Sequence, residues 1–137
     1  MKYTLTSKQF KGEMVFIFNS RNRLVYFDLR AELSDEQHDF FMAHMPKTIS
    51  GLDRFRTPTS SIKQVEPDLS FQSFWSEYNY KEGTKKRAEG LWNRLSRINR
   101  ILAIEFIRVY DGKLAQSGVA KLYPETYLSN QRWLTNE

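Results

Sequence analysis

The sequence predicts an α+β protein, with a β-hairpin and one or two helices followed by a mostly helical bundle. Three observations favour this fold class. Two short runs rich in β-branched and aromatic residues lie close together near the N-terminus, and apolar residues recur at helical spacing beyond residue 70. A stretch of linker composition separates the two patterns. We therefore expect a hairpin-and-helix unit over residues 1–56, a linker over 57–67 and a helical module over 68–137.

The composition is that of a folded protein without cysteine chemistry. The 137 residues are enough for one ordinary domain or two small units. The aromatic share of 15% favours a packed core over disorder. The absence of Cys excludes disulfides, thiolate metal sites and a cysteine nucleophile. Because neither a signal peptide nor a membrane-spanning run is visible, we expect a soluble, cytoplasmic protein that makes no membrane contact.

The predicted hairpin consists of residues 14–18 and 24–27, joined by turn-forming residues between them. Both runs are apolar at nearly every position, so both faces should be covered or a third strand should extend the pair. Residues 3–10 could supply that strand. One of these two arrangements is expected because a lone hairpin is marginal in water.

A helix is expected to begin after Ser34. Gln37 completes a capping box with this serine, and two acidic residues lie at the positive end of the helix dipole. Pro46 ends the helix, and a further short turn follows Thr48. The composition then changes to the Pro-, Ser- and Thr-rich stretch that we interpret as the linker.

Three helices are predicted in the second half, capped by Ser70, Thr84 and Ser96. The first two have apolar residues at i, i+3, i+4 and i+7, which predicts one buried face each. The longest helix, starting after Ser96, has apolar residues outside its main stripe, and Asp111–Gly112 could end or interrupt it. An aromatic tail, which should pack back on the bundle, follows. The tail residues are Tyr123, Pro124, Tyr127, Leu128 and Trp133.

Basic residues are concentrated in the second half of the chain. The formal net charge is +5. Between residues 81 and 121 ten basic residues stand against four acidic ones, which leaves the other residues at about −1. The charge therefore permits attraction of polyanions to the predicted helical module.

Two sequence blocks in the helical module form a pattern that periodicity does not explain. Residues 71–95 read F-x-x-F-W-x-x-Y, a Lys- and Gly-containing turn, and A-x-x-x-W-x-x-L, and residues 124–133 read PETYLSNQRW. This pattern resembles the C-terminal helical module of phage replication-initiation (replisome organizer) proteins over about residues 68–135. Tyr127 stands where that family usually has Trp, and Ser129 where Asn is common. The first 66 residues do not match the DNA-binding domain that such proteins usually carry.

The resemblance implies a phage- or mobile-element-derived protein that acts near replication initiation, with DNA or a replication protein as its partner. A helical wheel with Ala88 and Trp92 inward places basic residues outward, where they could neutralise phosphates. The alternative is an ordinary solvated helix face. The candidate nucleic-acid-binding residues are Lys85, Lys86, Arg87, Arg94, Arg97 and Arg100.

A second hypothesis is a protein-interaction module, either a homodimer or a replisome adaptor without direct DNA contact. Its basis is the additional apolar surface expected from Ile101, Ile104 and Ile107, which fall outside the main stripe of the longest helix. Salt separates the two hypotheses, because phosphate binding weakens steeply with added salt and apolar association does not.

Catalysis is not predicted, and neither is a cofactor or a metal. His38 and His44 are six residues apart, so they do not share a helix face as a zinc-binding pair would. The sequence contains neither a Gly-rich phosphate loop nor a nucleophile elbow. The acidic residues near His38 are explained by the dipole of the predicted helix.

Overall fold

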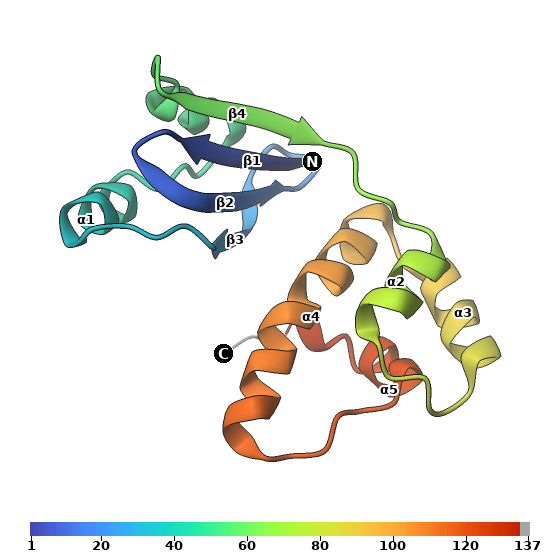
Figure 1. Ribbon diagram of the computed structural model, residues 1–137. Helices are drawn as coiled ribbons and strands as arrows, with labels where there is room; N and C mark the ends of the chain where they lie inside the picture. Colours follow the sequence, from blue (N-terminus) through green and yellow to red (C-terminus); the bar gives the residue numbers. More distant parts are fainter. Residues whose placement is uncertain (135–137) are drawn as a thin grey trace. The chain divides into compact units, whose positions relative to one another are not determined.

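The computed structural model describes residues 1–134, and residue contacts divide the chain between Pro67 and Asp68 into two compact units. Figure 1 shows a four-stranded sheet with a helix in the first unit and helices α2 to α5 in the second. Each unit has its own apolar core. The α+β fold class predicted from the sequence is confirmed.

The first unit is built on an antiparallel sheet in the strand order β3-β2-β1-β4. The predicted hairpin is present as β2 and β3, and the expected third strand is β1. The elements of this unit are β1 (Lys2–Ser7), β2 (Phe10–Phe18), β3 (Leu24–Leu29), α1 (Asp35–Ala43), the 3₁₀ helix η1 (Ile49–Phe55) and β4 (Ser60–Val65).

Strand β4 lies within the stretch 57–67, where the sequence predicts a linker. It pairs with β1 along its whole length, with Ile62 opposite Leu5. Ile62 packs on the core, whereas three of its neighbours in the strand are exposed. Polar and charged side chains are common on edge strands, where they discourage pairing with another chain. The boundary between the units therefore follows this strand.

The core cluster of the first unit lies on one face of the sheet, and Val15 and Ile17, which point to the other face, are buried as well. Met14, Phe16 and Phe18 alternate along β2 toward this face, as the period of two residues requires. Leu52 and Phe55 of η1 pack against them, and Phe41 of α1 adds to the same cluster. The predicted capping box of α1 is confirmed, because Ser34 and Gln37 exchange hydrogen bonds of 3.2 and 2.9 Å.

The second unit is helical, as predicted. Ser70 and Ser96 cap their helices through hydrogen bonds to backbone N–H groups three residues on. The longest helix does not end at Asp111–Gly112 but continues to Gly118, whose φ of +71° ends it in the left-handed region. The elements are α2 (Phe71–Tyr78), α3 (Lys85–Arg94), α4 (Arg97–Ser117), α5 (Pro124–Ser129) and the 3₁₀ helix η2 (Arg132–Leu134). The predicted module extends to residue 137, and its last three residues lie outside the described part.

An aromatic cluster forms the core of the helical unit. Phe74 of α2 stacks on Trp92 of α3 and on Tyr127 of α5, with ring centroids 5.0 and 6.0 Å apart. Tyr127 also contacts Trp133, at 5.6 Å, so the aromatic tail packs back on the bundle as predicted. In Figure 1, α2 lies between α3 and α4, in agreement with its contacts to both helices.

The isoleucines that suggested a homodimer do not form an exposed surface. Ile107 belongs to the helical core, and Ile104 packs against that core. Ile101 is buried as well. The sequence places Ile107 outside the main apolar stripe of the longest helix. Because both α2 and η2 contact α4, more than one side of this helix is covered. The apolar face on which the dimer hypothesis depends is therefore accounted for.

We expect Tyr127→Phe to lower the free energy of unfolding by about 1 kcal/mol, the typical net value of one hydrogen bond. The buried Tyr127 hydroxyl donates to the Ala103 carbonyl at 2.7 Å, and the substitution removes this bond without changing the ring packing. Urea denaturation measures the loss. Tyr123→Phe is the matched control because Tyr123 is 51% exposed. Equal stability of the two variants would contradict a stabilising role of this hydrogen bond.

Candidate functional sites

The orientation of α3 determines which of the predicted basic residues reach solvent. Ala88 and Trp92 are buried in the core, and the Trp92 indole N–H donates to the Leu69 carbonyl at 3.0 Å. With these two residues facing inward, helix geometry turns the opposite side of α3 outward. That side is exposed along the helix, as the predicted wheel requires.

The N-terminus of α3 is held by α5 and not by the predicted cap. Thr84 occupies the N-cap position, but its side chain makes no capping hydrogen bond. The Glu125 carboxylate instead accepts the Thr84 N–H at 2.6 Å, a charge-assisted bond at the positive end of the helix dipole. Gly83, with φ of +85°, leaves room for this carboxylate, because a Cβ there would collide with Glu125.

Three of the six predicted residues are free cations. Lys86, Arg87 and Arg94 are exposed, and within residues 1–134 none of them has an ion pair, hydrogen bond or ring contact. Lys85 is also exposed, but its ammonium lies 5.4 Å from the centre of the Trp75 ring, which is a cation–π distance. Arg97, at the start of α4, is exposed too.

Arg100 has a structural role that sequence reasoning missed. Its guanidinium donates to the carbonyls of Trp92 and Asn93 at 3.2 and 3.0 Å, and it lies 5.9 Å from the Trp92 ring. These carbonyls are at the C-terminal end of α3, where a cation is favourable. Arg100 therefore joins α4 to the end of α3 and is less available to a ligand than the three free cations.

Gly90 lies at the centre of the outward face of α3. Its helical neighbours at i−4, i−3, i+3 and i+4 are Lys86, Arg87, Asn93 and Arg94. A Cβ at this position would have no atom within 4 Å, so packing inside the protein does not require glycine. The three free cations thus surround a patch of bare helix backbone.

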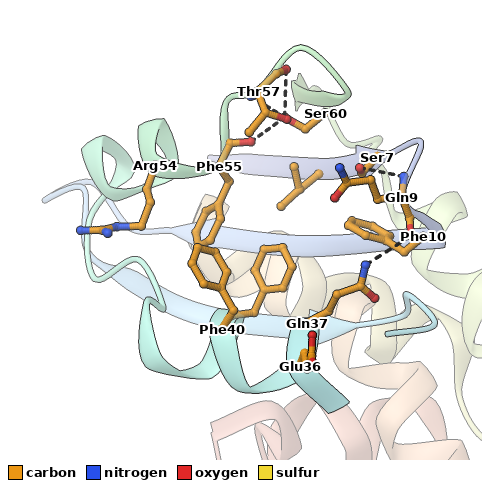
Figure 2. A pocket seen from close by; sticks show the side chains of 12 residues that line it. Ser7, Gln9, Phe10, Glu36, Gln37, Phe40, Arg54, Phe55, Thr57 and Ser60 are labelled. Carbon is orange, nitrogen blue, oxygen red and sulfur yellow. Dashed lines mark hydrogen bonds between the residues drawn. The ribbon is translucent and has the colours of Figure 1, made fainter. Parts of the chain in front are cut away.

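A cavity of about 300 Å³ lies in the first unit, between α1 and the connection from η1 to β4. Figure 2 shows phenyl rings at both ends, with Phe10 on one side and Phe40 and Phe55 on the other. Leu5 and Phe41 complete the apolar lining. The polar lining consists of Ser7, Gln9, Glu36, Gln37, Arg54, Thr57 and Ser60. No sequence pattern indicated this cavity, because its lining comes from three separate stretches of the chain, within residues 5–10, 36–41 and 54–60.

The turn between α2 and α3 and the chain after α4 are joined by tyrosine hydrogen bonds. The Tyr78 hydroxyl donates to the Leu122 carbonyl at 2.6 Å, and burial raises the pKa of Tyr78 far above its ordinary value of 10.0. This tyrosine is therefore a protonated donor and not a catalytic base. Lys121 covers the same ring at 4.3 Å and pairs with Asp111 at 2.8 Å. Tyr80 is half-buried and stacks on Tyr123.

The two histidines and the acidic residues of the described part of the chain do not gather into a metal-binding cluster. His38 Nδ1 lies 3.9 Å from Asp39, and both side chains are at least half exposed. Over residues 1–134, His, Asp and Glu side chains form no group of three that could hold a metal ion. In the same range, none of the helices is both long and apolar enough to cross a membrane. The pKa of Asp68 is lowered by hydrogen bonds from Ser70, so the shift has a local cause at the start of α2.

One comparison with known proteins gives a match. The family model of the Legionella vir region protein LvrA C-terminal domain matches residues 66–131, which is similar in extent to the helical unit. The match lies over the stretch that resembles the phage replication module, but it gives no support to that family. No curated protein and no solved structure matches the chain.

We expect Arg100→Ala to lower the free energy of unfolding by about 1–2 kcal/mol, because the last carbonyls of α3 lose a charged donor. Arg94→Ala serves as the control, since Arg94 is exposed and has no partner among residues 1–134. Its effect should stay within about 0.5 kcal/mol. Chemical denaturation of both variants measures the two free energies of unfolding. Similar losses in both would contradict a structural role that is specific to Arg100.

Proposed function

We propose that the protein binds nucleic acid through the outward face of α3, as a non-enzymatic accessory protein linked to a phage or mobile element. The observation that carries the proposal is the arrangement of Lys86, Arg87 and Arg94 around Gly90. Guanidinium and ammonium groups on one face neutralise phosphates and release their counterions.

The lack of acidic partners separates this face from an ordinary solvated helix face. Surface helices commonly pair basic residues with acids three or four positions away. Glu89, the only acid of α3, makes no ion pair within the described part of the chain. The three cations therefore keep their full charge for an external anion.

The chemistry of the face favours phosphates over stacked bases. Proteins that bind single strands without sequence preference use exposed aromatic rings as platforms. The aromatic residue of α3, Trp92, is buried, and the exposed side chains of α3 are charged or polar. Asn93, beside the free cations, has an amide that could contact a base edge or a phosphate. A duplex, with phosphates closely spaced on both strands, is the ligand that matches this face best.

The comparison supports the link to a mobile element. The matching family is named for the vir region of Legionella, and its model covers the unit that contains α3. The match supports the proposal that the protein is encoded in a virulence or mobile-element region, but it does not specify the molecular partner. The proposal that the partner is nucleic acid rests on the α3 face.

Removing the three free cations should weaken duplex binding. For the variant with Lys86, Arg87 and Arg94 changed to Ala, we expect the slope of log affinity against log salt to fall by about 2–3, or about 0.9 for each lost phosphate contact. Fluorescence anisotropy with single- and double-stranded DNA between about 50 and 200 mM salt measures this slope.

The matched control removes the same net charge from the first unit. Lys8, Lys11 and Lys47 are exposed and unpaired within residues 1–134, so their change to Ala should leave the slope unchanged. Equal losses in both triple variants would show attraction by net charge alone. A wild-type protein that binds neither form of DNA at low salt would overturn the proposed function.

Gly90→Ala should stabilise the protein and weaken binding at the same time. Alanine favours an exposed helix by about 1 kcal/mol over glycine, and no atom obstructs the added methyl group. The same methyl group would hold a phosphate backbone away from the helix surface. Thermal denaturation and anisotropy on one preparation test both effects, and a stabilised variant with unchanged affinity would exclude close contact at Gly90.

A further inference from the structure

Several polar side chains that line the cavity of the first unit form hydrogen bonds with its walls. Gln37 donates to the Gln9 carbonyl at 3.2 Å and accepts the Ser34 N–H at 2.9 Å. The Ser60 hydroxyl donates to the Phe55 carbonyl at 2.5 Å and accepts a backbone N–H, and the Ser7 hydroxyl accepts the Gln9 N–H at 3.0 Å. These groups fix the walls of the cavity, whereas the side chains of Gln9, Glu36 and Arg54 make no hydrogen bond or ion pair within residues 1–134.

The same hydrogen bonds keep the cavity open. The Gln37–Gln9 bond joins α1 to the turn between β1 and β2, and Ser60 joins the start of β4 to the end of η1 (Figure 2). Helix α1 contains no fully buried residue, so its position on the sheet depends on the Gln37–Gln9 bond and on the packing of Phe41. A preformed apolar cavity lowers the ordering cost of binding an apolar group.

The aromatic lining continues out to the surface. Phe41 and Phe55 lie 4.8 Å apart, and Phe10 and Phe40 are each about 6 Å from Phe41. Phe40 is 48% exposed at the edge of the cavity. A small metabolite needs a few placed polar groups to orient it, whereas the surface of this cavity is predominantly apolar. An apolar side chain of a protein is oriented by its own backbone, and it would cover the exposed ring as well.

The charge beside the cavity is negative on the side of α1. Glu36 lines the cavity, Asp39 lies one helical turn further on, and α1 contains neither Lys nor Arg. Arg54, on the opposite wall, points away from the cavity (Figure 2). A partner with a positive charge beside its apolar group is therefore complementary to this rim.

From this geometry we infer that the cavity under α1 binds an aromatic or long aliphatic side chain of a partner protein, flanked by Lys or Arg. The apolar lining receives the side chain, and the carboxylates of α1 attract the flanking cations. This protein-binding site is separate from the proposed nucleic-acid surface, because its lining belongs wholly to the first unit.

The test uses the full chain, labelled with ¹⁵N, and three short peptides followed by NMR. One peptide has a central Phe between Lys residues, the second has Ala in place of Phe, and the third has Glu in place of Lys. We expect the first to shift the amides of Phe10, Phe41 and Phe55, and the second to bind about tenfold more weakly because the apolar anchor is absent. The third should bind severalfold more weakly.

Two variants test the lining and the rim. Phe40→Ala should weaken the first peptide about tenfold, because a ring of the cavity wall is lost. Met42→Ala is the control, since Met42 is on the same helix and 42% exposed but does not line the cavity. Glu36→Lys should reverse the preference between the Lys- and Glu-flanked peptides.

Several outcomes would overturn the inference. The first is no shift at the cavity with the Phe peptide, and the second is equal binding of the Phe and Ala peptides. A third is free indole binding as tightly as the Phe peptide, which would indicate a small-molecule site. If Glu36→Lys still preferred the Lys-flanked peptide, the inference that the partner carries Lys or Arg beside its apolar group would be wrong. None of these outcomes affects DNA binding, which is measured separately.

Discussion

The outward face of α3 depends on the buried position of Trp92. The Trp92 ring stacks on Phe74 at 5.0 Å, its indole N–H donates to Leu69, and its carbonyl accepts from Arg100. A helix advances by about 100° per residue, so a shift of one position in either direction would bury Arg87 or Glu89 in place of Ala88. Because burying an unpaired polar group costs free energy, α3 has a single favourable orientation about its own axis. The free cations reach solvent as a consequence.

Other helices fix α3 at both ends. Glu125 of α5 accepts the N–H of the N-cap residue Thr84, and Arg100 of α4 donates to the last carbonyls. A helix of ten residues is marginal in isolation, so these contacts with the aromatic core supply much of its stability. They also place the cations on a rigid element, which lowers the entropy lost on binding an anion. The charged residues that hold the helix are thus distinct from those that remain free.

The sequence predicted the parts of the fold that depend on local periodicity. The spacing of Phe74 and Trp75 and of Ala88 and Trp92 placed the buried faces of α2 and α3 correctly, because a 3.6-residue period has one inward side. It could not predict β4, since most residues of this edge strand are polar and only Ile62 is anchored. Arg100 and Glu125 act between helices, and the cavity depends on Gln37 reaching Gln9, 28 residues away. Such tertiary contacts leave no periodic signal.

The two candidate surfaces carry opposite charges, so they select ligands of opposite charge. The acids of α1 repel a phosphate backbone, whereas the free cations of α3 repel a basic partner. Neither ligand therefore competes for the other's surface. Phosphate binding weakens steeply with salt, while insertion of an apolar side chain into the cavity depends mainly on surface removed from water. A protein with both surfaces could keep a protein partner through changes of ionic strength that release the nucleic acid, as expected of an accessory protein that brings the two together.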